Sequence, residues 1–303
     1  MGIKVYDRKS KKYYEEIQYK SKALHFLYDT MLGRIILKWF ILGKTYSNYN
    51  ARQNEKRSSV SKIKPFIEEY KINEEEFETT DFRSFHEFFR RRLKSEARPI
   101  CPEEEAFISI ADSKLRCYPI DDRAAIKIKN SIYTIAELIG VDGEFNQQLV
   151  HNQLKEYQGG TCLVFRLTVD DYHHYVHFDE GEIVQKRVIP GKLHTVGPIS
   201  AKRYKVYSEN SREVSRLRTK CFGEVMQVEV GALLVGKIVN HGETHFQRGQ
   251  EKGWFEMGGS TIVLLFQKDA VYMDQDIMKH SEMEIETKVI LGEKIGVRGK
   301  KHD

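Results

Sequence analysis

The sequence is poor in the residues and segments that define several large classes of protein. Only four cysteines occur in 303 residues, they lie far apart, and no CxxC pair is present. A disulfide framework or a zinc site is therefore not expected, and the thiols are predicted to be reduced. No apolar run is long enough to span a membrane, and the N-terminus is too polar for a signal peptide.

A strong charge of either sign is missing as well. The formal net charge is +5, from 49 Lys and Arg residues against 44 Asp and Glu residues. This mild excess fits an anionic partner such as a lipid surface or a nucleic acid, and it also fits no such partner. With 40% hydrophobic and 31% charged residues, the composition is that of a globular protein with a substantial core.

The first hundred residues are predicted to be a helical, basic region. The run from Met31 to Leu42 is apolar except for Arg34 and Lys38, which a helix would place on one stripe. Such a stripe, with a tryptophan nearby, is what an interfacial helix needs to lie among lipid headgroups. The same run could instead pack on the core with its two cations reaching solvent. The sequence leaves both alternatives open.

A second helix is predicted to begin at Thr80 or Asp81 and to continue to Leu93, because apolar residues recur there at helical spacing. It contains the run Arg90-Arg91-Arg92. A phosphate-binding patch is one interpretation of that run, but cations are favoured in the last turn of a helix, so a solvated helix end is the preferred one.

Beyond residue 100 the pattern changes to short strands separated by turn residues. The expected strands are 124–128, 162–167, 183–189, 225–230, 233–239 and 262–266, with one clear helix at 134–139. We therefore predict an α+β fold in which an N-terminal helical region (1–100) packs on a mainly antiparallel β core (101–303).

Three segments of the β region carry residues able to do chemistry. The first is Gly258-Gly259-Ser260-Thr261, directly before an apolar strand. Glycines allow backbone angles closed to other residues, and a serine that follows them could reach the preceding carbonyl in a strained turn. By itself, such a segment most often is a tight turn that enters a buried strand.

The second segment, 170–178, contains three histidines within five residues, at 173, 174 and 177. Imidazoles titrate near neutral pH, so the segment suits proton transfer, and metal binding is the rival interpretation. In a regular strand His173 and His177 share one face, about 13 Å apart. A bend would be needed for both to serve one site.

The third segment places Asp112 between Ala111 and Ser113. By itself this is an ordinary turn aspartate. Together with a histidine and a serine, however, an aspartate can form a triad that activates the serine. In such a triad the carboxylate orients the imidazole, and the imidazole removes the hydroxyl proton. An intact serine hydrolase built from Asp112, His173 and Ser260 is therefore one alternative.

These segments resemble the phosphatidylserine decarboxylase family, in the form found in several anaerobic bacteria. The family cleavage motif LGST or GGST, its Ala-Asp-Gly/Ser context and its Asp-Tyr-His segment are matched at 258–261, 111–113 and 171–173. Its SFNEFF, RPI, TVNPI and VGA segments are similar to 84–89, 98–100, 195–199 and 230–232. Matches that run in family order from about residue 80 to 268 are far more specific than any single motif.

The histidine segment departs from the family pattern Asp-Tyr-His-Arg-x-His. Three residues after His173 stands Val176, and the next histidine is His177. One alternative is that the pattern shifts by one residue, so that His174 and His177 form the pair. We take His173 as the base because Asp171-Tyr172 precedes it as in the family, and we keep His177 as a second candidate catalytic residue.

The resemblance implies a precursor that cuts itself between Gly259 and Ser260. Ser260 would attack the carbonyl of Gly259, with His173 as base and Asp112 as the group that orients it. The products would be a large chain, 1–259, and a small chain, 260–303, held together as a heterodimer.

The resemblance also implies a cofactor, a substrate and a location. Ser260 would become a covalent pyruvoyl group that forms a Schiff base with the amine of phosphatidylserine and acts as an electron sink. His173 or His177 would then protonate the product, phosphatidylethanolamine. A peripheral enzyme on the cytoplasmic face of the cell membrane is expected, without a metal or a nucleic-acid partner, and a homo-oligomer is left open. A pyruvoyl decarboxylase of a soluble amino acid is the alternative.

Overall fold

A computed structural model describes residues 3–16, 21–128, 131–140, 154–233, 237–258 and 260–299. Gly259, one half of the predicted cleavage site, lies outside the described residues, as does part of the strand predicted at 233–239.

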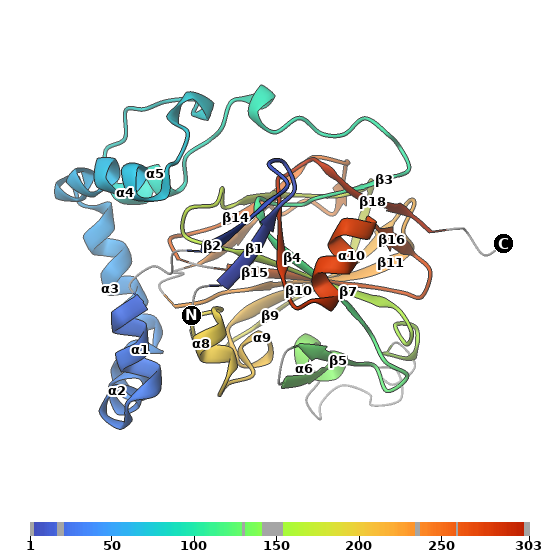
Figure 1. Cartoon of the computed structure of the whole chain (residues 1–303), viewed down its shortest axis with the longest axis horizontal. Coiled ribbons are helices and arrows are strands. Elements are labelled where there is room, and N and C mark those ends of the chain that lie inside the picture. Colours follow the sequence, from blue (N-terminus) through green and yellow to red (C-terminus); the bar gives the residue numbers. More distant parts are fainter. Residues whose placement is uncertain are drawn as a thin grey trace.

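A ten-stranded sheet forms the centre of the protein (Figure 1). Its order is β13-β9-β10-β11-β15-β7-β4-β17-β1-β2, and neighbouring strands are antiparallel except β1 and β17, which run parallel. In chain order the strands are β1 (Ile3–Asp7), β2 (Lys12–Glu16), β4 (Ser113–Pro119), β7 (Thr161–Leu167), β9 (Gly181–Ile189), β10 (Arg212–Thr219), β11 (Glu224–Val230), β13 (His245–Phe246), β15 (Ser260–Phe266) and β17 (Glu286–Val289).

Smaller sheets and helices cover the two faces of the large sheet. One hydrophobic cluster joins one face to two three-stranded sheets: β12 (Ile238–Asn240), β14 (Glu251–Phe255) and β8 (His174–Val176), and β16 (Val271–Met273), β18 (Lys294–Arg298) and β3 (Ala106–Ile108). A second cluster joins the other face to β5 (Ala125–Ile128), β6 (Ser131–Thr134), α6 (Ile135–Ile139) and α9 (Val206–Glu209). Alternation of side chains along each strand builds two separate cores from one sheet.

The remaining helices lie mostly in the first hundred residues. Helices α1, α2 and α3 follow one another along one side of the sheet, with α4 and α5 beyond them (Figure 1). Their bounds are α1 (Ser21–Asp29), α2 (Met31–Ile36), the π-helix η1 (Leu37–Ile41), α3 (Lys44–Glu55), η2 (Arg57–Lys62), α4 (Ile63–Tyr70), η3 (Glu74–Glu76), α5 (Phe85–Phe89) and η4 (Ser95–Ala97); later in the chain come α8 (Pro198–Ala201) and α10 (Gln275–Glu282).

The predicted fold class is confirmed: the protein is α+β, with its helices mainly N-terminal and a largely antiparallel core. The helix predicted at 134–139 is α6, which begins with a capping box between Thr134 and Glu137. The division of the chain near residue 100 stays a prediction.

Two local predictions were wrong. The helix expected from Thr80 or Asp81 is only α5, because Ser84 caps it by accepting a hydrogen bond from the backbone N–H of Glu87. Residues 3–16 form a β-hairpin, not a helix, and β1 pairs with β17 from the far end of the chain. A pairing partner so distant in sequence leaves no local periodicity to detect.

Candidate active site

Ser260 is the first residue of β15. It pairs with Leu167 of β7. Residues two apart in a strand share one face, so its side chain points with those of Ile262 and Leu264 toward the face covered by β8 and β14. The residue is fully buried, and its Oγ has no hydrogen-bond partner among the described residues. An unpaired buried hydroxyl costs roughly 1–3 kcal/mol, so the site carries a polar group that packing alone does not explain.

The turn before Ser260 depends on glycine. Gly258 has a φ of 134°, a backbone angle that residues with a Cβ rarely adopt. The backbone bends at Gly258. The next residue, Gly259, belongs to the undescribed part of the chain.

His173 lies directly before β8, on the side of the large sheet toward which Ser260 points. Its side chain is fully buried, and its ring packs on Phe89 at 4.3 Å between centroids. Nδ1 lies 2.9 Å from the carbonyl oxygen of Asp171, and Nε2 has no hydrogen-bond partner among the described residues. Nδ1 is thus occupied, and Nε2 makes no hydrogen bond of normal geometry, although the Gly258 backbone also interacts with the ring.

The surroundings of His173 favour the neutral imidazole. Burial, followed by the nearby Arg91 guanidinium, lowers the pKa of His173 to about 3. The backbone of Asp171, the carboxylate of Asp170 and the backbone of Gly258 oppose this change. A neutral ring can accept a proton at pH 7. Because the Gly258 backbone affects the pKa of His173, the imidazole lies near the residue two positions before Ser260.

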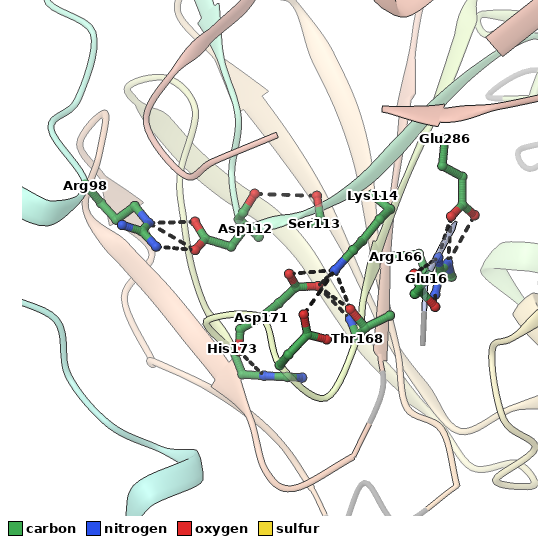
Figure 2. Close-up of polar contacts among 12 residues, drawn as sticks. Glu16, Arg98, Asp112, Ser113, Lys114, Arg166, Thr168, Asp171, His173 and Glu286 are labelled. Atoms are coloured by element: carbon green, nitrogen blue, oxygen red, sulfur yellow. Dashed lines mark hydrogen bonds and ion pairs between the residues drawn. The ribbon is translucent and has the colours of Figure 1, made fainter. Parts of the chain in front are cut away.

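Asp112 lies at the start of β4, but it does not contact His173 through any described hydrogen bond. Arg98 donates from Nε and Nη2 to the Asp112 carboxylate at 2.7–3.0 Å (Figure 2). The Leu291 N–H also donates to this carboxylate, at 2.9 Å. The predicted hydrogen bond from the imidazole to Asp112 is therefore replaced by one to the carbonyl of Asp171.

His177 has different neighbours from His173. Strand β8 covers only the three residues between them, so the two histidines flank it instead of sharing its face. The His177 ring stacks on Phe246 at 3.8 Å, and burial, followed by the charge of Lys252, lowers its pKa to about 3. Among the described residues, no group of three or more His, Cys, Asp or Glu side chains could hold a metal ion.

A buried ion pair that the sequence did not reveal supports the histidine segment. Lys114 Nζ lies 2.8 Å from both carboxylate oxygens of Asp171 and also bonds Thr168 (Figure 2). Burial alone would lower the pKa of Lys114, but Asp171 and Asp170 raise it above its ordinary value. The sequence signal for this ion pair was a lysine two residues after Asp112, within a strand whose other residues are mostly buried.

A hollow near these residues has a volume of about 290 Å³ and is lined by Arg91, Arg98, Asp112 and Asp171, among others. Ser260 and His173 are not among its lining residues. The Ser260 side chain is instead fully enclosed by the described part of the chain.

Comparison with known proteins gives concordant matches over nearly the whole chain. The family model for phosphatidylserine decarboxylase matches residues 85–297. The chain is 52% identical to the "Phosphatidylserine decarboxylase proenzyme 2" of Clostridium acetobutylicum, over 98% of this chain and 99% of the relative. It is 37% identical to the proteins named "Phosphatidylserine decarboxylase proenzyme" of Clostridium novyi, over 98% and 99%, and of Ruminiclostridium cellulolyticum, over 97% of each.

Proposed function

The chain belongs to the phosphatidylserine decarboxylase family, and from this premise we propose that it decarboxylates phosphatidylserine after cutting itself between Gly259 and Ser260. The observation that carries the proposal is the buried, unpartnered Ser260 hydroxyl at the start of β15, on the side of the sheet where His173 has a free ring nitrogen. A nucleophile without access to solvent suits attack on its own chain better than the turnover of a diffusing ester, which a serine hydrolase requires.

The first step is a transfer of the acyl group from nitrogen to oxygen. Ser260 Oγ attacks the carbonyl carbon of Gly259 while Nε2 of His173 removes the hydroxyl proton. The C–N bond to Ser260 then breaks, and the proton passes to the departing amine, which leaves an ester in place of the peptide.

The second step separates the chains. Loss of the Cα proton of Ser260 and cleavage of its Cβ–Oγ bond release the Gly259 carboxylate and leave dehydroalanine at position 260. Water then enters and ammonia leaves, so that the small chain begins with a pyruvoyl group.

The residues around Ser260 fit such a group, because a small polar side chain with no hydrogen-bond partner already occupies the position among apolar neighbours. The pyruvoyl group supplies a carbonyl that accepts the electron pair left behind when carbon dioxide departs. His173 is proposed to hold and move protons beside it, and His177 stays a second candidate for protonating the product.

The two products of cleavage are proposed to stay together as a heterodimer. The small chain would contain β15, which lies between β11 and β7, and β17, which lies between β4 and β1. All four of these neighbours belong to the large chain. Separating the chains would break four strand pairings inside the large sheet, so cleavage leaves the fold in place.

Asp112 is proposed to contribute to cleavage, and one pair of variants tests this. Asp112→Asn should slow cleavage at least about tenfold, because it removes the charge that Arg98 and the Leu291 N–H bind. Glu76→Gln is the matched control, since Glu76 is the other carboxylate on Arg98. Densitometry of the two chains over time measures both rates. A wild-type rate for Asp112→Asn would remove Asp112 from the site, and equal slowing in both variants would mean that it acts only through Arg98.

A surface of α2 and η1 is proposed to contact the membrane. Five large apolar side chains there are 48–75% exposed: Met31, Leu32, Ile35, Trp39 and Phe40. Large apolar side chains exposed so close together in the chain are typical of an interaction site. The opposite side of the same helices is packed, with Leu37 buried against Tyr28. In the part of the chain that the structure describes, no helix is long and apolar enough to cross a membrane.

This arrangement suits a protein that lies on the lipid surface. Lys38 stands among the exposed apolar residues of η1, with its ammonium 5.9 Å from the Trp39 ring. Apolar side chains can enter the acyl region while a cation meets anionic headgroups, as on the cytoplasmic face of the cell membrane. A decarboxylase of a soluble amino acid would have no use for such a surface.

The double variant Trp39→Ser/Phe40→Ser should weaken binding to phosphatidylserine-containing liposomes at least about tenfold, because two aromatic anchors lose their apolar burial. Val188→Ser is the matched control, since Val188 is 66% exposed on β9. Co-sedimentation measures binding, and self-cleavage should continue in both variants. Unchanged liposome binding by the double variant would contradict the proposal. Deletion of residues 1–44 should also weaken binding, but it removes β1 and β2 from the sheet as well.

A further inference from the structure

Arg91 is a buried cation that the proposed chemistry has not yet used. It is only 4% exposed, whereas Arg90 and Arg92 on either side of it are exposed. The solvated helix end predicted for the three arginines is therefore wrong at Arg91. In the described residues Arg91 forms no ion pair, and Nε and Nη1 have no hydrogen-bond partner. The carboxylates of Asp112, Asp170 and Asp171 act on its charge without forming an ion pair. A buried cation without a hydrogen-bonded counter-ion destabilises a fold, so a reason for its presence is needed.

The contacts of Arg91 converge on the turn that carries His173. Its Nη2 donates to the carbonyl oxygens of Asp170 at 3.2 Å and Asp171 at 3.3 Å. The guanidinium lies over two aromatic rings, 5.4 Å from the centroid of Phe77 and 5.1 Å from that of Phe88. The rings and the carbonyls together hold the cation in place, since cations are attracted to aromatic faces.

The carbonyl of Asp171 connects Arg91 to the imidazole. The same oxygen that accepts from Arg91 lies 2.9 Å from Nδ1 of His173. A carbonyl cannot donate, so Nδ1 must carry the hydrogen and the neutral ring must leave Nε2 as the acceptor. Lys114 holds the carboxylate of the same aspartate, as Figure 2 shows. The backbone carbonyl of Asp171 is therefore bound by one cation and its carboxylate by another.

We propose that Arg91 is a positioning residue for self-cleavage: by binding the carbonyls of Asp170 and Asp171, it orients His173 as the Nδ1–H tautomer with Nε2 free to take the proton of Ser260. The role in cleavage rests on the proposed function. The contacts among Arg91, Asp171 and His173 are present in the uncut chain.

The charge of Arg91 has a second effect on the same ring. The groups that act on the imidazole are the Arg91 guanidinium after α5, the Asp170 carboxylate, and the backbones of Asp171 and Gly258. Apart from burial, Arg91 is the influence that lowers the pKa of His173. Removing this charge should raise that pKa, so the neutral form would be lost at a higher pH than in the wild type.

The tautomer can be measured without altering Arg91. Nitrogen-15 NMR of histidine in the full-length Ser260→Ala chain should show a neutral His173 at pH 7, protonated at Nδ1, with His173→Gln in the same background identifying the signal. An Nε2–H tautomer or an imidazolium at pH 7 would overturn the proposal. This result does not depend on whether the wild-type chain cuts itself, so failure of the proposed function is distinguishable from failure of the inference.

The kinetic role is tested by Arg91→Met and Arg91→Lys. Arg91→Met should slow cleavage about tenfold to a hundredfold, as expected when hydrogen bonds from a charged group are lost. Its rate should also begin to fall on the acid side about one pH unit higher than that of the wild type. Arg91→Lys keeps the charge, so it should slow cleavage without moving the pH profile.

Arg92→Met is the matched control, because Arg92 is the exposed neighbour in the same run and its side chain is 59% exposed. It should cleave like the wild type, and thermal melting of each variant reports on folding. A purely structural role for Arg91 would lower the melting temperature and the rate while leaving the pH profile unmoved in Arg91→Met. That outcome, or a wild-type rate and pH profile in a folded Arg91→Met chain, would refute the proposal. If Arg91→Met does not fold, Arg91→Lys and the tautomer measurement decide.

Discussion

Replacing Ser260 by alanine is expected to abolish cleavage and to leave one uncut, full-length chain. The wild-type protein should instead give two chains, 1–259 and 260–303. Intact-mass spectrometry identifies the reaction as well as the position of the cut. The small chain should be lighter by one ammonia than the peptide that simple hydrolysis would produce, because its N-terminus becomes pyruvoyl.

The structure supplies a matched control for this variant. Ser215 of β10 is also fully buried with an unpartnered Oγ, so Ser215→Ala removes the same group from the same sheet. Ser215→Ala should cleave at the wild-type rate. The central proposal fails if the wild-type chain stays intact under all conditions, or if Ser260→Ala is cut at the same bond as the wild type.

Replacing His173 by alanine is expected to slow self-cleavage about 10²–10⁴-fold, which is the range for loss of a positioned acid or base. The pKa of His173 responds to the backbone of Gly258, two residues before Ser260. The His177 ring instead stacks on Phe246, and the charge of Lys252 lowers its pKa. His177→Ala should therefore cut itself at nearly the wild-type rate.

The comparison of the two variants also separates the two stages of the chemistry. A His177→Ala enzyme that cuts itself but decarboxylates slowly would assign His177 to the protonation of the product. The opposite result, in which His177→Ala stays uncut and His173→Ala is processed normally, would exchange the roles of the two histidines. Melting curves are needed for both, because each ring is buried against an aromatic side chain.

The pH dependence of cleavage follows from the same ring. Because burial and Arg91 lower the pKa of His173 to about 3, the imidazole stays neutral from pH 8 down to well below pH 5. A neutral base keeps its function, so the wild-type rate should be nearly constant over that interval. An unperturbed histidine would instead lose activity between about pH 7 and 6.

The sequence by itself determined the strands of the core and the residue that we propose as the nucleophile. Runs of alternating or continuous apolar residues such as 162–167 and 262–266 have one stable place, inside a sheet with two buried faces, and they became β7 and β15. Ser260 could be named because glycines and a buried strand flank it, and because the other motifs follow in family order.

Only the tertiary structure decided which side chains meet at the site. Asp112 was predicted to face His173, but Arg98, fourteen residues earlier in the chain, binds its carboxylate instead. Arg91 was predicted to be solvated and is buried against the turn at Asp170 and Asp171. These outcomes depend on competition among partners that are distant in sequence, and local periodicity holds no information about that competition.

The exposure of the surface of α2 and η1 also depends on segments that are distant in sequence. Its apolar residues were compatible with burial or with a membrane, and the composition of the helix could not distinguish the two. The choice depends on how much of that helix the rest of the protein covers, and the fold covers Leu37 but leaves Trp39 and Phe40 exposed. Local sequence determines what each segment can be, whereas the packing of distant segments determines which groups are left free to act.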